Sequence, residues 1–102
     1  MSSPNSDGSS GAVTRVLKII NEKGLHARAS AKFVGVVETF RDGTSIKVSR
    51  GEETVSGDSI MGLMMLGAGI GSSITVSATG AQAREAVDAL DALVSSRFGE
   101  EE

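Results

Sequence analysis

Residues 81–98 place apolar side chains at intervals of three and four, with charged residues between them. The apolar positions are Ala83, Ala86, Val87, Leu90, Leu93, Val94 and Phe98. This spacing predicts an amphipathic α-helix over 81–98, because residues three or four apart lie on one face of a helix. A helix with one apolar face needs a second layer of secondary structure to cover that face. The rest of the chain must supply that layer.

Short segments with alternating apolar and polar residues predict a β-sheet. Residues 13–20 are rich in β-branched side chains, and residues 44–49 and 73–79 alternate. A turn at 50–52 leads into a return segment at 53–56, which predicts a hairpin. The sequence therefore contains four strands to pack against its helices.

Two further helices are expected between these strands. Residues 27–40 carry apolar side chains at helical spacing and end at an Arg-Asp-Gly break, and residues 59–66 form a short apolar segment followed by Gly67. The resulting order is βαββαβα. We predict an α+β fold in two layers, an open-faced β-sandwich with a four-stranded sheet covered on one face by three helices.

The composition limits both the organisation and the function of the chain. Its 102 residues suffice for a single core. We expect residues 1–11, which are rich in Ser and Gly, to form a flexible tail, and residues 12–102 to form one domain. A net charge of −3 argues against a nucleic-acid partner, which needs a basic surface.

Other classes of protein are disfavoured on similar grounds. No apolar stretch approaches the roughly 20 residues that a membrane-spanning helix needs, so no membrane insertion is expected. The chain has no cysteine and one histidine, which disfavours a structural zinc site and suits a reducing cytoplasm. We therefore expect a cytoplasmic domain without a metal.

His26 is that single histidine, and it stands directly before the helix predicted from residue 27. The first backbone N–H groups of a helix lack internal partners and lie at its positive end, so an anion is stabilised there. A neutral imidazole at this position has a lone pair for nucleophilic attack, and Arg28 offers a planar set of donors to phosphate oxygens. The pattern suits a covalently held phosphoryl group; the alternative is a polar or capping histidine without chemistry.

Three blocks of sequence support the first interpretation. The motif Gly24-Leu25-His26-Ala27-Arg28 resembles the active-site motif of the histidine-containing phosphocarrier family, HPr, of the bacterial phosphoenolpyruvate-dependent phosphotransferase system. Residues 59–67 resemble that family's regulatory serine segment, and residues 71–80 with the helix after them also fit. The resemblance covers about residues 13–98 and implies that the sheet is antiparallel.

The resemblance also implies a reaction and its partners. Phosphorylated enzyme I would donate a phosphoryl group to Nδ1 of His26, Arg28 would stabilise the group, and an enzyme IIA-type acceptor would receive it during sugar transport. A monomeric carrier of this kind needs no cofactor or metal, and it is an intermediate in transfer rather than a stand-alone catalyst. The alternative is a nitrogen-branch regulatory protein whose phosphorylation state controls metabolic enzymes. Both use the same residues.

Ser59 is implied to be a second phosphorylation site, the substrate of an HPr kinase/phosphorylase. Its structural alternative is the N-cap of the short helix, a role for which Asp58 competes. The family also commonly has proline after the motif arginine, whereas this chain has Ala29, which permits the helix with a less constrained start.

The short helix is too apolar to be an ordinary surface helix. It cannot bury its whole circumference in a two-layer fold, and methionine suits an adaptable binding surface. We expect Leu63 and Leu66 to be mainly buried. The resemblance implies that Ile60, Met61 and Met64 contact partner enzymes beside His26.

Overall fold

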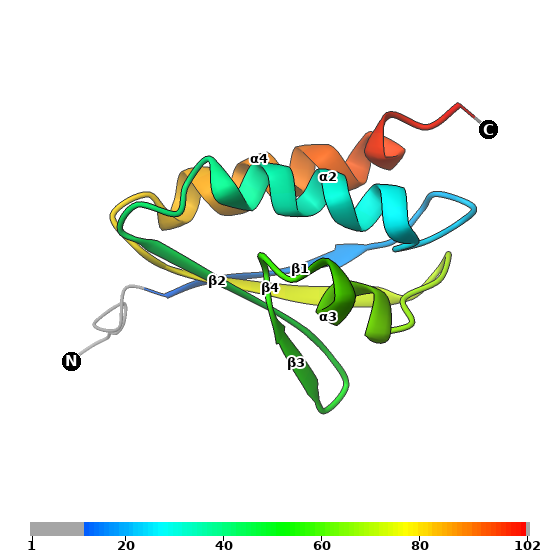
Figure 1. Cartoon of the computed structure of the whole chain (residues 1–102), viewed down its shortest axis with the longest axis horizontal. Helices are drawn as coiled ribbons and strands as arrows, with labels where there is room; N and C mark the ends of the chain where they lie inside the picture. Colours follow the sequence, from blue (N-terminus) through cyan, green and yellow to red (C-terminus); the bar gives the residue numbers. More distant parts are fainter. Residues whose placement is uncertain (1–11, 102) are drawn as a thin grey trace.

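The computed structural model describes residues 12–101, so the predicted tail at 1–11 lies outside the described residues. The strands and helices follow the predicted order (Figure 1). The elements are β1 (Val13–Lys18), α2 (Ala27–Glu38), β2 (Thr44–Arg50), β3 (Glu53–Ser56), α3 (Ile60–Met65), β4 (Ser73–Gly80), α4 (Ala83–Ser95) and the 3₁₀ turn η1 (Arg97–Gly99).

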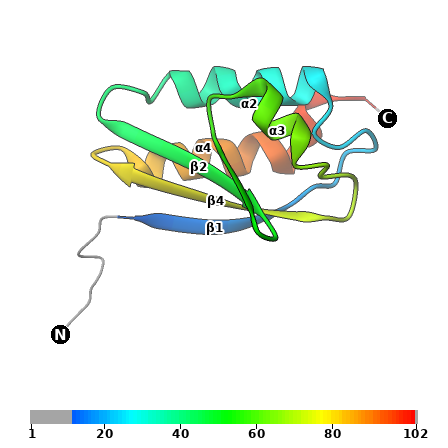
Figure 2. The same ribbon diagram turned by 60° about the horizontal axis from the view of Figure 1, so that its bottom comes forward.

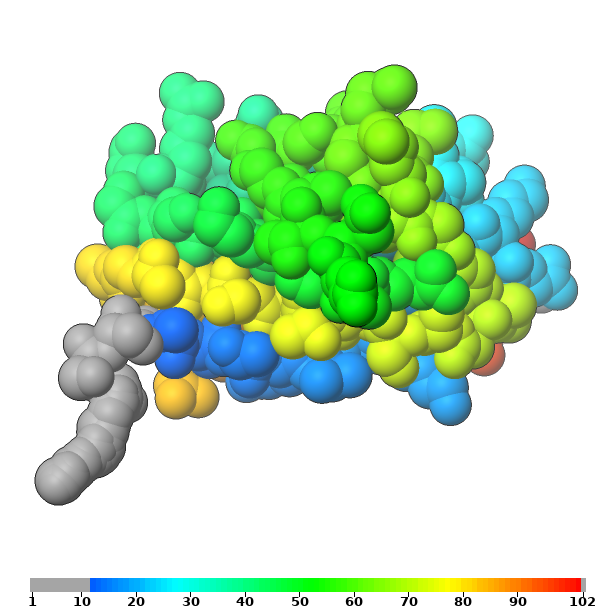
Figure 3. Space-filling model, turned by 90° about the horizontal axis from the view of Figure 1, so that it is seen from below, coloured from blue at the N-terminus to red at the C-terminus, as the bar shows by residue number. Residues whose placement is uncertain are grey.

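The four strands form one antiparallel sheet in the order β1-β4-β2-β3. Helices α2 and α4 lie side by side over one face of this sheet, and α3 lies beside α2 near β3 (Figures 1 and 2). The opposite face presents β1 and β4 at the molecular surface (Figure 3). The open-faced α+β sandwich predicted from the sequence is confirmed.

The core lies between the sheet and the helices because β1, β2 and β4 alternate more buried and more exposed side chains. Helix α4 is also held to β1 by ion pairs from Arg15, whose Nη1 lies 2.8 Å from Asp88 Oδ1 and 3.1 Å from Asp91 Oδ2. The largest fully buried apolar side chains are Ile19, Phe33, Leu63, Ile74, Leu90 and Phe98.

The prediction of a single helix over 81–98 is wrong at the C-terminal end. Helix α4 stops at Ser95, and the backbone of the following turn is left-handed, with φ of 60° at Arg97, 56° at Phe98 and 73° at Gly99. Phe98 is nevertheless fully buried. The apolar spacing therefore predicted its burial correctly, although the backbone at this residue is not α-helical. Similarly, α2 ends at Glu38, two residues before Phe40.

Candidate functional site

The loop between β1 and α2 is held close to the loop that follows α3. Leu25 N–H donates to the Ala68 carbonyl at 2.9 Å. Gly24 has a φ of +63°, and a Cβ on it would lie 2.4 Å from the Ala68 oxygen. Only glycine fits this close backbone approach without a shift. The Gly-Leu-His motif is thus tied to the end of α3.

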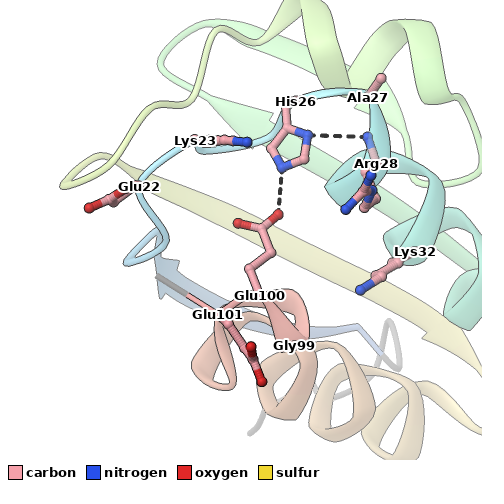
Figure 4. Close-up of a pocket in the computed structure, with 9 residues that line it drawn as sticks. All are labelled: Glu22, Lys23, His26, Ala27, Arg28, Lys32, Gly99, Glu100 and Glu101. Carbon is pink, nitrogen blue, oxygen red and sulfur yellow. Dashed lines mark hydrogen bonds and ion pairs between the residues drawn. The ribbon is translucent and has the colours of Figure 1, made fainter.

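His26 is the N-cap of α2, with extended backbone and a side chain that faces the first helical turn. Its Nδ1 accepts a hydrogen bond from Arg28 N–H at 3.3 Å, and its Nε2 lies 2.5 Å from Glu100 Oε2 (Figure 4). An N–H donor facing Nδ1 and a carboxylate facing Nε2 place the ring proton on Nε2. The lone pair of neutral His26 is therefore on Nδ1, at the positive end of α2.

An open pocket of about 590 Å³ surrounds this ring. The Arg28 side chain lines the same pocket, and among residues 12–101 no hydrogen bond or ion pair occupies its guanidinium. Its donors are thus available to an anion near Nδ1. The other residues that line the pocket are Glu22, Lys23, Ala27, Lys32, Gly99, Glu100 and Glu101.

Glu100 is a site residue that our sequence interpretation missed. Its carboxylate bonds the imidazole of His26 through Oε2 and accepts a 3.1 Å hydrogen bond from Asn21 Nδ2 through Oε1. The hydrogen bond from His26 is the main cause that lowers the pKa of Glu100 below its ordinary value, with Asn21 adding to it against the opposing effect of burial. Glu100 is consequently a carboxylate at neutral pH.

Ser59 is the N-cap of α3, as its capping alternative predicts. Its Oγ accepts a hydrogen bond from Gly62 N–H at 2.9 Å, whereas Asp58 Oδ1 accepts from the Ser56 hydroxyl at 2.6 Å. Asp58 therefore does not take the cap. The half-buried Ser59 side chain stands at the edge of the exposed face of α3.

Helix α3 divides its apolar residues as expected. Leu63 and Leu66 are buried, whereas Met61 is 69% exposed and both Ile60 and Met64 are about 40% exposed. Helix α3 packs against α2, the helix that begins next to His26. We define Ile60, Met61 and Met64 as the α3 surface.

Within the described part of the chain, no three His, Asp or Glu side chains gather closely enough to hold a metal ion. No helix among these residues is both long enough and apolar enough to cross a membrane.

The fold and site define a small antiparallel α+β protein with one histidine at a helix N-terminus. A family model described as "PTS HPr component phosphorylation site" matches residues 13–96. The chain is 51% identical to the phosphocarrier protein HPr of Cupriavidus necator, over 82% of this chain and 92% of that protein. It is 40% identical to the phosphocarrier protein NPr of Shewanella violacea, over 84% of this chain and 92% of that protein.

The similarity extends to solved structures. A crystal structure of HPr from Thermoanaerobacter tengcongensis superposes with a TM-score of 0.82 at 39% identity, covering 88% of this chain and 99% of that one. The chain therefore belongs to the HPr family of phosphocarrier proteins of the phosphotransferase system.

Proposed function

We propose that this protein carries a phosphoryl group on His26 Nδ1, which it accepts from phosphorylated enzyme I and passes to an enzyme IIA-type acceptor. The observation that carries the proposal is His26 Nδ1, which faces the first N–H groups of α2 in a pocket that the Arg28 side chain also lines. Membership of the family supports the same reaction.

The proposed step conserves the ring proton. Arg28 N–H leaves Nδ1 and turns to a phosphoryl oxygen, which frees the Nδ1 lone pair. That lone pair attacks phosphorus, and the bond from phosphorus to the donor breaks as its electron pair returns to the donor. The ring keeps its proton on Nε2 and becomes positively charged, while first-turn N–H groups and Arg28 bind the phosphoryl oxygens. Transfer to the acceptor reverses these changes, so the chain positions the group and stabilises charge.

Two further roles belong to the same proposal. The α3 surface serves as the docking site for the partner enzymes because it is apolar, exposed and on a helix packed against α2. Ser59 serves as a regulatory phosphorylation site for an HPr kinase/phosphorylase. We place the protein in the cytoplasm as a monomer.

The nitrogen-branch alternative uses the same site with a different acceptor, and the match to an NPr supports considering it. The identity of 51% to an HPr favours the sugar branch as the first candidate. A regulatory acceptor that takes the group much faster than a sugar-specific one would reverse this order.

Incubation with phosphoenolpyruvate and enzyme I tests the carrier function. We expect one acid-labile phosphoryl group per chain, which is then lost to an added IIA acceptor. The matched control is His26→Asn, because asparagine retains an N-cap acceptor for α2 but has no imidazole. Equal acid-labile labelling of folded His26→Asn would refute the proposal.

A further inference from the structure

The carboxylate of Glu100 meets the nitrogen of His26 that lies opposite the attacking one. Nε2 bonds Glu100 Oε2 while Nδ1 faces the N-terminus of α2 (Figure 4). The side chain of Glu100 is 13% exposed and that of His26 is 27% exposed. A carboxylate accepts hydrogen bonds and cannot donate one, so it requires a proton on Nε2.

Asn21 fixes the orientation of Glu100. Asn21 is fully buried, and its Nδ2 donates to both the Gly24 carbonyl, at 2.9 Å, and Glu100 Oε1, at 3.1 Å. If the amide were flipped, its oxygen would face the Gly24 oxygen, so both N–H donors are committed in this orientation. The Asn21 side chain therefore presents only a donor to residue 100.

The backbone before Glu100 adopts an uncommon conformation. Three successive residues, Arg97, Phe98 and Gly99, have positive φ, and two of them are not glycine. The turn is held by the buried Phe98 ring and by a 2.7 Å hydrogen bond from Lys32 Nζ to the Phe98 carbonyl. Such a backbone conformation is costly and is retained only where the surrounding structure enforces it. When it lies next to a reactive group, it suggests a function for the residue that it positions.

We propose that Glu100 is a positioning residue that, held by Asn21, keeps the proton of His26 on Nε2 and so reserves the Nδ1 lone pair for phosphorus. The inference rests on the proposed carrier function of His26. In the same contact, the carboxylate stabilises the positive charge that the ring gains when the Nδ1–phosphorus bond forms. Glu100 gives up no proton and takes none, since Nε2–H persists through the step.

The Glu100→Gln substitution gives this idea a sharp test. Asn21 offers only N–H to residue 100, so the new amide turns its oxygen toward Asn21 and its NH₂ toward His26 Nε2. An NH₂ group there competes with the Arg28 N–H that faces Nδ1, and it shifts the ring proton toward Nδ1, where the proton occupies the nucleophilic lone pair. Glu100→Ala removes the carboxylate without imposing the wrong tautomer. Glu100→Gln should therefore be the slower variant, although it is the closer in shape.

The tautomer can be read directly, because His26 is the only histidine in the chain. We would record ¹⁵N chemical shifts of the ring at about pH 8.5, two units above the reference pKa of histidine. The wild type should show Nε2–H, and Glu100→Gln should shift toward Nδ1–H. The rate of phosphoryl transfer from enzyme I should fall about ten- to hundredfold in Glu100→Gln, and less in Glu100→Ala.

Glu85→Gln is the matched control. It removes the same charge from an exposed residue of α4 that does not line the pocket, and it should change neither the tautomer nor the rate by more than about twofold. The other charged groups of the pocket remain in all variants; they are Glu22, Lys23, Arg28, Lys32 and Glu101. Circular dichroism checks that each variant is folded.

The carrier function of His26 and the positioning role of Glu100 can be refuted separately. A wild type that accepts no phosphoryl group from enzyme I would refute the carrier function. A wild type that is phosphorylated, beside a folded Glu100→Gln that retains Nε2–H or accepts the group at least as fast as Glu100→Ala, would refute the positioning role alone.

Discussion

Ser59 caps helix α3 and also adjoins the proposed docking surface, and two substitutions separate its effect on stability from its effect on docking. Its hydroxyl caps α3 by accepting the Gly62 N–H at 2.9 Å. Ser59→Ala removes that acceptor and should cost about 1 kcal/mol of the free energy of unfolding. For a domain of this size, that loss corresponds to a melting temperature lower by about 4–8 °C.

Ser59→Asp should behave in the opposite way. Aspartate is as good an N-cap as serine, and its charge lies at the favourable end of the helix, so the melting temperature should stay at or slightly above the wild-type value. The new charge adjoins the exposed α3 surface and must lose water when a partner covers Ile60, Met61 and Met64. A docking penalty of about 1.4 kcal/mol corresponds to roughly tenfold slower transfer from enzyme I.

The assay pairs thermal unfolding with the rate of acid-labile phosphorylation at subsaturating protein. We expect Ser59→Ala to be less stable but to accept the phosphoryl group normally, and Ser59→Asp to be stable but slow. A genuine phosphate would add about −1.5 to −2 charges and should slow transfer further. Wild-type kinetics in folded Ser59→Asp would leave Ser59 as a helix cap and remove the basis for a regulatory role.

Three further predictions concern the site. Arg28→Ala should slow phosphoryl transfer about ten- to hundredfold without moving the adduct from His26, and an unchanged rate would show that the helix terminus alone suffices. Gly24→Ala should lower the free energy of unfolding by about 2 kcal/mol or more in urea titrations, because its Cβ would lie 2.4 Å from the Ala68 oxygen; wild-type stability would contradict this. The pKa of Glu100 is lowered in the folded state, so its carboxylate stabilises the fold fully above the pKa of an unfolded glutamate and loses that effect as the pH falls through the lower folded-state pKa. The difference in free energy of unfolding between wild type and Glu100→Gln should therefore shrink on acidification.

The fold could be predicted because its elements have distinct periods. A period of two residues identifies the strands and a spacing of three to four residues identifies the helices, although this spacing does not set the helix ends at Glu38 and Ser95. The position of His26 at the N-terminus of α2 could be predicted as well. Gly24 lies just before it, and apolar residues at helical spacing follow it. Even the division of α3 follows from a general constraint, because a short helix on a two-layer protein can bury only one side, here that of Leu63 and Leu66.

The same apolar spacing gave no indication that Glu100 belongs to the site. Apolar spacing continues to Phe98, which predicts a continuous helix, yet the backbone turns left-handed at Arg97 and Phe98. A left-handed backbone conformation costs about 1–2 kcal/mol for each non-glycine residue. No local sequence pattern predicts it here. Tertiary contacts offset this cost, because the Phe98 side chain is fully buried and Lys32 of helix α2 donates a hydrogen bond to the Phe98 carbonyl. Glu100 thus reaches His26 across 74 residues of sequence, through packing that only the folded chain contains.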